Sequence, residues 1–210
     1  MTYDIQKFTN RHPTLKFFSS HPPKKSESSK IVEEDSIADL VHFVSNQIDN
    51  VPNKNIGNPF IDISMIRWFA YLNQTAFMNY YKASAYIAKL YRTAQCGEYC
   101  NILYLDLEHY LPPRSVIEIF SARWRNGFDH SYIKIKLPKG YQWPDGSRVR
   151  FCDAWHIKDH PESKGVYSAK EMNEILRYYG HSHPFSILSE TARHTSPIPF
   201  IKNATYSVTH

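Results

Sequence analysis

Three residues of this sequence have the types and the local settings to perform chemistry together: Cys96, His130 and Asp153. Cys96 follows the run RTAQ and opens an apolar stretch, which predicts a thiol at the N-terminus of a helix. His130 stands at the head of an alternating strand pattern, and Asp153 stands at the end of another. The chain therefore offers a thiol, an imidazole and a carboxylate at the ends of regular elements.

Each position suits nucleophilic catalysis. A helix N-terminus favours a thiolate over a thiol, an imidazole can accept the thiol proton, and a carboxylate can fix the tautomer of the imidazole. The segment between Cys96 and His130 has room for a helix, a loop and a strand, and Pro144-Asp145-Gly146 predicts a turn between the strands of His130 and Asp153. The spacing thus permits a Cys-His-Asp triad.

The same motifs carry a family resemblance between Arg92 and Trp155. Cys-Gly-Glu at Cys96, Asp-His-Ser-Tyr around His130 and Cys-Asp-Ala-Trp around Asp153 resemble the papain and transglutaminase superfamily. Within it they are most similar to small Cys-His-Asp domains of bacterial effectors and toxins, such as YopT and the C-terminal domain of Pasteurella multocida toxin.

The resemblance implies a thiol enzyme with a papain-like fold. Cys96 would be the nucleophile, His130 the general base and acid, and Asp153 the orienting carboxylate. Relatives act on host proteins as proteases, deamidases or transglutaminases, so it also implies a host protein substrate, and it implies no cofactor and no metal. The three residues do not choose among these reactions.

The source of the oxyanion-hole donors is open in the sequence. Papain-like enzymes have a glutamine several residues before the cysteine, and here Leu90 or a neighbour occupies that place. The backbone N–H of Cys96 is one expected donor, and the side chains of Gln95 and Asn73 are candidates for the other. Trp155 is a candidate to shield the site or to pack beneath it.

Other readings of the same residues stay open. Taken alone, Cys96 is more often a packed small hydrophobe than a nucleophile. Cys96 and Cys100 lie one helical turn apart and could bind zinc together with Cys152, Asp153, His130 or His156, although no second tight ligand pair is present. Cys100 is expected to face the core.

A binding module without catalysis is the alternative from a different functional class. Five tyrosines occur from Tyr71 to Tyr91 within a stripe at helical spacing, which favours packing but could line a groove for a host protein. The net charge of +5 and the pI of about 9.0 suit an acidic partner surface. Because the positive residues are scattered, no specific nucleic-acid binding is expected.

Composition bounds the architecture. A chain of 210 residues with 42% hydrophobic and 21% charged residues suffices for one domain with a core. We expect a flexible N-terminal segment over residues 1–32, a single catalytic domain over 33–185 and a tail over 186–210. Oligomeric state stays undetermined.

The cysteines and the hydropathy indicate the expected compartment. Three cysteines cannot all pair within one chain, and neither a secretory apolar segment nor a run long enough to span a bilayer is present. A soluble protein in a reduced compartment is expected, and the resemblance adds delivery into a host cytosol by a specialised secretion system.

The predicted elements give an α+β fold with N-terminal helices and a small antiparallel sheet. Apolar spacing predicts a helix from Glu33 to Ile48, a loop from Asn50 to Pro59 and one long helix over 66–81. Strands are predicted over 115–120, 132–137 and 148–153, with strict alternation placing Asp153 on the face of Val149 and Phe151. The capping box at Ser168 predicts a last helix ending at Gly180, and His181 with His183 a surface loop.

Overall fold

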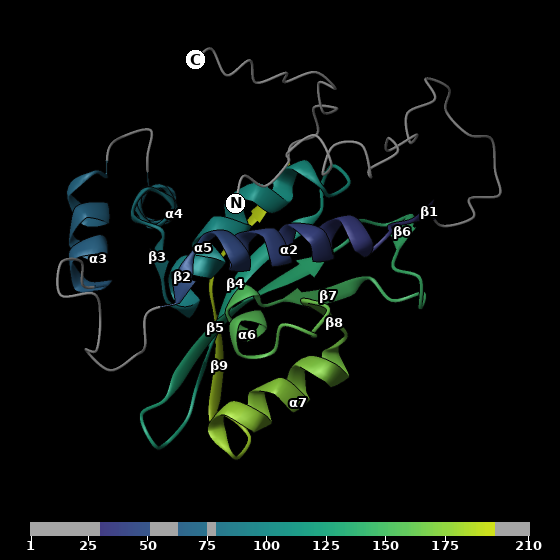
Figure 1. The fold of residues 1–210 in the computed structure, drawn as a ribbon. Coiled ribbons are helices and arrows are strands. Elements are labelled where there is room, and N and C mark those ends of the chain that lie inside the picture. Colours follow the sequence, from purple (N-terminus) through teal and green to yellow (C-terminus); the bar gives the residue numbers. More distant parts are fainter. Residues whose placement is uncertain (1–29, 51–62, 75–78, 196–210) are drawn as a thin grey trace, which may run out of the picture.

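The computed structural model describes residues 30–50, 63–74 and 79–195. These residues form a five-stranded antiparallel sheet with helices packed around it (Figure 1). The α+β class expected from the sequence is confirmed. Most of the expected N-terminal segment, the loop to Pro59 and residues 196–210 lie outside the described residues.

The sheet has the strand order β8-β7-β5-β4-β9. Its central pair is β4 (Val116–Arg123) and β5 (Asp129–Lys136), joined by a short turn that contains Gly127 at a φ of 83°. β7 (Val149–Cys152) pairs with β5, and β8 (Val166–Tyr167) pairs with β7. The three predicted strands are therefore present, with β5 beginning three residues earlier than predicted.

Two short parallel pairs lie outside this sheet. β1 (Lys30–Ile31) pairs with β6 (Tyr141–Gln142), and β2 (Asp49–Asn50) pairs with β3 (Thr93–Ala94). β6 belongs to the segment that links β5 to β7. The expected flexible segment over 1–32 is therefore corrected at its C-terminal end, where Lys30 and Ile31 form a strand. The Lys30 N–H donates to Gly140 O at 2.9 Å and the Val32 N–H donates to Gln142 O at 2.8 Å, which holds this strand in place.

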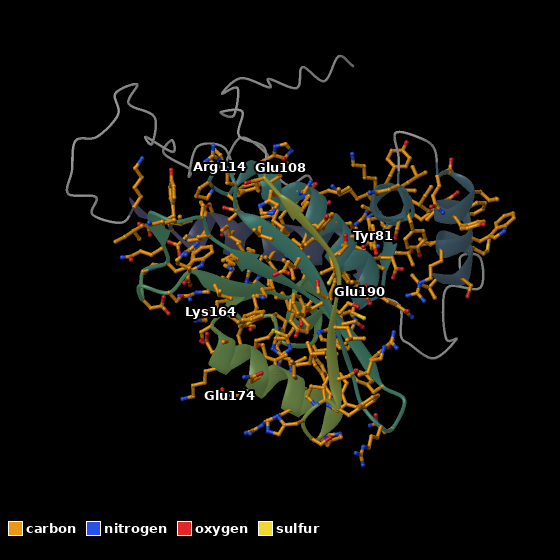
Figure 2. All side chains as sticks on the ribbon, turned by 180° about the vertical axis from the view of Figure 1, so that it is seen from behind. Tyr81, Glu108, Arg114, Lys164, Glu174 and Glu190 are labelled. Carbon is orange, nitrogen blue, oxygen red and sulfur yellow. The ribbon has the colours of Figure 1, made fainter. Side chains whose placement is uncertain are left out.

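The expected tail over 186–210 is also corrected, because β9 (Ser186–His194) forms an edge of the sheet beside β4. Figure 2 shows Glu190 on this strand. Arg193 on β9 donates to the Glu108 carboxylate at 2.8 Å, which ties the strand to the helical layer. Most side chains of β9 are exposed, so neither face of the strand is apolar. A hydrophobicity pattern therefore could not predict this strand.

The N-terminal helix α2 (Asp35–Gln47) and the last helix α7 (Ala169–Gly180) agree with their predictions. In α2 the apolar residues recur on one buried face, and in α7 the Ser168–Glu171 capping box is formed at the first turn. Gly180 ends α7, and His181 follows in the left-handed conformation.

The prediction of one long helix over 66–81 is wrong. The structure has α3 (Ile63–Leu72) and α4 (Tyr80–Tyr91) instead, and Phe77 of the predicted stripe lies outside the described residues. Asn79 is the N-cap of α4, with its side chain accepting from the Lys82 N–H at 3.1 Å. An asparagine that competes for backbone donors starts a helix rather than continuing one.

The sheet separates two cores. One core joins α2, α4 and α5 (Cys96–Asp106) to the isoleucines of β4 and β5 that share a face, Ile117, Ile119, Ile133 and Ile135. The other core joins Met172 and Leu176 of α7 to Ala122 and Tyr132 on the opposite face. Figure 1 shows α2 and α7 on opposite sides of the strands. The short helices η1 (Leu107–His109) and α6 (Ala154–Asp159) complete the described fold.

The predicted face of Asp153 is corrected as well. β7 ends at Cys152, which is buried in the core with the isoleucines, and Asp153 is the N-cap of α6 with φ −148° and ψ 95°. The chain turns into a helix at this residue, so strand alternation does not extend to it. The carboxylate is placed by the helix cap.

α7 approaches the β4–β5 turn unusually closely at Gly180. A Cβ atom on Gly180 would lie 1.9 Å from Trp124 Nε1, and the same indole nitrogen donates to Ser182 O at 2.9 Å. Only a residue without a side chain permits this approach. Gly180 therefore sets how α7 lies on the sheet.

We expect Gly180→Ala to lower the free energy of unfolding by about 1 to 3 kcal/mol, because the indole of Trp124 must move out of a packed core. Urea unfolding followed by circular dichroism measures this. Gly97→Ala is the matched control, since a Cβ there meets no atom within 4 Å, and it should leave the stability unchanged or raise it. Equal effects of the two changes would contradict the packing argument.

Candidate active site

Cys96 is the first residue of α5 and is partly exposed. Gln95 is the N-cap of this helix, with Glu98 completing a capping box in which the Gln95 N–H donates to Glu98 Oε2 at 3.2 Å. The sequence thus starts a helix at the thiol, as predicted, because the capping pair flanks it in the chain. Cys96 lies where the unpaired N–H groups and the helix dipole favour an anion.

Arg67 of α3 connects the neighbouring helices to this N-terminus. Its guanidinium donates to Glu98 Oε1 at 2.9 Å and to Gln95 Oε1 at 3.2 Å. Burial opposes the charge, but the hydrogen bond and the charge of Glu98 raise the pKa of Arg67, and Cys96 adds a smaller contribution. A fixed positive charge therefore lies near the thiol.

His130 and Asp153 form a buried pair. His130 Nε2 lies 2.6 Å from Asp153 Oδ2, and the side chains are 0% and 1% exposed. β5 carries the histidine as its second residue, and the adjacent strand β7 ends immediately before the aspartate. The two residues that the sequence placed on neighbouring strands therefore come together.

The other oxygen of Asp153 is bound to the backbone. Oδ1 accepts from the His156 N–H at 3.0 Å, which caps α6. The carboxylate is thus held at both oxygens and cannot rotate away from the imidazole without losing the helix cap. Such an acceptor fixes Nε2 of His130 as the protonated nitrogen and leaves Nδ1 as the base.

Nδ1 of His130 is buried and has no hydrogen-bond partner among the described residues. Burial alone would lower the pKa of this imidazole. The charge of Asp153 and its hydrogen bond, together with a contribution from Cys96, outweigh burial and raise the pKa of His130 from 6.5 to about 10. Cys96 is therefore close enough to His130 to interact with it, and the arrangement favours an imidazolium.

The two other thiols are free and buried, with no exposure to support reactivity. Burial raises the pKa of Cys100 and of Cys152, with the charge of Asp153 as the next cause for both. Cys100 faces the core as predicted. Of the three cysteines, Cys96 alone is partly exposed, and it alone contributes to the raised pKa of His130.

Three aromatic rings enclose the imidazole of His130. The ring centroid of Trp155 is 5.0 Å away, that of Tyr179 is 5.0 Å away and that of Tyr132 is 6.4 Å away. Trp155 thus lies against the histidine, where the sequence placed it as a shielding or packing residue. The rings come from α6, α7 and β5, so water is kept from the His130–Asp153 pair by three separate elements.

The candidate oxyanion donors have defined places. Gln95 turns its side-chain oxygen toward Arg67 at the start of α5, in the capping box. Asn73 follows α3, is exposed, and donates from Nδ2 to Phe69 O at 2.8 Å. Gln95 thus lies next to Cys96 at the start of α5. The Asn73 amide instead bonds to a carbonyl at the end of its own helix, α3.

Sequence reasoning missed His156 and Tyr179 as members of the site. In the sequence, His156 is a candidate only for a zinc site, and Tyr179 falls within the predicted last helix with no chemical signal of its own. In the structure His156 Nδ1 lies 2.6 Å from the Tyr179 hydroxyl, and both rings pack near His130 and Asp153. The apolar spacing that predicted α7 was the only signal, and it could not indicate which face of the sheet the helix covers.

The described residues contain no group of three His, Cys, Asp or Glu side chains arranged to hold a metal ion. Among them, too, no helix has the length and apolar character to cross a membrane. Comparisons with protein-family models, with curated proteins and with solved structures give no match. The inference of function therefore depends on the site itself.

The raised pKa of His130 has a consequence for stability. The folded protein holds the imidazole proton more tightly than the unfolded chain does, so the stabilisation is complete below pH 6.5 and is lost as the pH rises toward about 10. Asp153 is the largest of the causes that raise this pKa, and it is kept when Cys96 is replaced.

We expect the free energy of unfolding of Cys96→Ala to fall above pH 6.5, with a slope of at most about 1.4 kcal/mol per pH unit. Urea titrations between neutral and alkaline pH measure this slope. The double variant Cys96→Ala/His130→Gln is the control, because it keeps every other titrating group. Identical slopes in the two proteins would show that His130 does not hold its proton in the folded state.

Proposed function

We propose that this protein is a thiol enzyme that transfers the acyl group of a protein amide. The observation that carries the proposal is the buried His130–Asp153 pair at 2.6 Å, together with Cys96, a partly exposed cysteine at a helix N-terminus that contributes to the raised pKa of His130. A packed structural cysteine needs neither an imidazole nor a helix N-terminus. The resemblance to papain and transglutaminase domains supports the same assignment.

In the proposed reaction the Cys96 thiolate attacks the amide carbon and forms a tetrahedral oxyanion. The imidazolium of His130 protonates the departing amine or ammonia, and the C–N bond breaks to leave a thioester. His130 then accepts a proton from water or from a second amine, which attacks the thioester and releases Cys96. Asp153 stays ionised and holds the imidazole in its tautomer.

The backbone next to Cys96 is uncrowded among the described residues, which suits the approach of a large substrate. A Cβ atom on Gly97, the residue after Cys96, would meet no atom within 4 Å. The backbone N–H groups at the start of α5 point toward the same end of the helix and are the proposed stabilisers of the oxyanion. Water as the acceptor gives a deamidase or a cysteine protease, and an amine gives a transglutaminase.

A second candidate function, a binding module for a host protein, is favoured by one observation. α3 and α4 expose large apolar side chains, including Trp68 at 57%, Tyr71 at 67% and Tyr86 at 60%. Tyr and Trp are enriched at the centres of protein interfaces. Ile66 and Ala70 of the predicted stripe are buried, as expected of packing residues, whereas these three side chains lie on the exposed faces of the helices. This exposed surface could serve either a substrate or a non-catalytic partner.

The alkylation of Cys96 tests the proposal directly. We expect wild-type Cys96 to react with iodoacetamide below neutral pH, and His130→Ala to react at least about tenfold more slowly there, because the imidazolium stabilises the thiolate. Mass spectrometry of the Cys96 peptide gives the rate, and the buried Cys100 and Cys152 serve as internal controls. His183→Ala, which removes an exposed histidine that follows α7 and is bonded to Arg177, should leave the rate unchanged.

If Cys96 is inert, or responds to pH like a free thiol in both proteins, the thiol-enzyme proposal is wrong and the binding module takes its place. The two proposed functions also predict different results for Cys96→Ala. We expect this variant to lose all modification of a substrate protein while keeping the fold, whereas a binding module would bind its partner unchanged. Thermal unfolding of each variant verifies that the fold is intact.

A further inference from the structure

Four residues around the proposed site form a closed ring of contacts. His130 is bonded to Asp153, Asp153 accepts the His156 N–H, His156 Nδ1 is bonded to the Tyr179 hydroxyl, and the Tyr179 ring lies against His130. The residues come from β5, the β7–α6 junction, α6 and α7. These contacts therefore connect α7 to the His130 imidazole by two routes, one through the phenol ring of Tyr179 and one through its hydroxyl.

The direction of the His156–Tyr179 hydrogen bond follows from the surroundings. Burial raises the pKa of Tyr179, so the phenol keeps its proton and donates. Burial lowers the pKa of His156, and His160 and His130 lower it further, while Asp153 and Asp159 oppose them. His156 is therefore neutral near neutral pH, accepts at Nδ1 and carries its proton on Nε2.

We infer that Tyr179 is a positioning residue that holds the His130 imidazole at the angle from which Nδ1 serves Cys96, and that His156 locks Tyr179 for this task. This inference rests on the proposed function. A phenol ring packed on an imidazole restricts the tilt of that imidazole only if the ring is itself fixed. The hydroxyl bond at 2.6 Å to His156 provides the second point that fixes it.

Among the described residues, Tyr179 is the only side chain of α7 with a ring contact to the imidazole. Asp153 holds Nε2, which leaves rotation about that hydrogen bond, and Trp155 covers the ring from α6. The ring centroids of Trp155 and Tyr179 are 4.9 Å apart, so the two rings pack against each other. Loss of the Tyr179 anchor would let both rings and the imidazole shift together, and a misplacement of about 1 Å is enough to weaken a proton transfer substantially.

Tyr167 offers a matched control. Its hydroxyl is also hydrogen bonded, to Ser163 at 2.7 Å, and its ring also contacts His156 in the same core. No ring contact joins Tyr167 to His130 among the described residues. Tyr167→Phe and Tyr179→Phe therefore remove similar hydroxyl bonds and should destabilise the fold by similar amounts, but only the second releases a ring that touches the imidazole.

The experiment is the pH profile of Cys96 alkylation by iodoacetamide in the full chain. We expect Tyr179→Phe to slow the reaction below neutral pH by about tenfold and to move the profile toward that of a free thiol. Tyr167→Phe should keep the wild-type profile. Urea unfolding of both variants verifies that they are folded and equally stable under the assay conditions.

Rescue by a conservative change adds a second arm. Asparagine has a polar atom close to the place of the histidine Nδ1, so His156→Asn can still accept the Tyr179 hydroxyl and should keep the profile within about twofold. His156→Leu cannot accept it and should behave like Tyr179→Phe. A purely structural role would make the alkylation profiles follow stability instead of the hydrogen bond.

The outcomes separate this inference from the proposed function. If wild-type Cys96 depends on His130 but Tyr179→Phe has the wild-type profile, the positioning role is overturned and the thiol enzyme stands. If the wild type shows no dependence on His130, the proposed function itself is overturned. A His156→Leu profile equal to that of the wild type would also overturn the role of His156.

Discussion

The site depends on one interaction, the hydrogen-bonded pair of His130 and Asp153 in the interior. A buried carboxylate is costly unless it is paired and hydrogen bonded, and the structure meets this need at both oxygens. The pair connects β5 to the junction of β7 and α6. Because each partner is nearly inaccessible to water, removing either would leave an unpaired charge or an unpaired imidazole in the core.

The surrounding elements place this pair near Cys96, the one cysteine of the three that is partly exposed. α5 begins at Cys96 because a capping box starts the helix there, and Arg67 joins α3 to the same helix end. On the opposite face of the sheet, Gly180 lets α7 approach Trp124, which brings Tyr179 against the imidazole. The thiol is thus carried by a helix of one core, and the tyrosine that packs on the imidazole is carried by a helix of the other core.

Local signals predicted much of this arrangement. Capping residues and apolar spacing predicted α2, α5 and α7, β-branched residues predicted β4, and alternation predicted β5 and β7. These elements bury one face or bind their own ends. The same reasoning gave a wrong long helix where Asn79 caps α4, and it missed β9, whose side chains are mostly exposed. It also gave the wrong face for Asp153, because a helix begins where the strand was expected to continue.

Cys96, His130, Asp153 and Trp155 can be predicted as candidates from the amino-acid sequence, because residue type and local setting decide whether a thiol can stand at a helix start or a carboxylate at a strand end. The contacts of Tyr179 and His156 with these residues, and the capping of α6 by Asp153, become visible only in the folded chain. Those contacts depend on which face of the sheet α7 covers and how closely it approaches, which are properties of packing between distant segments that no local pattern encodes.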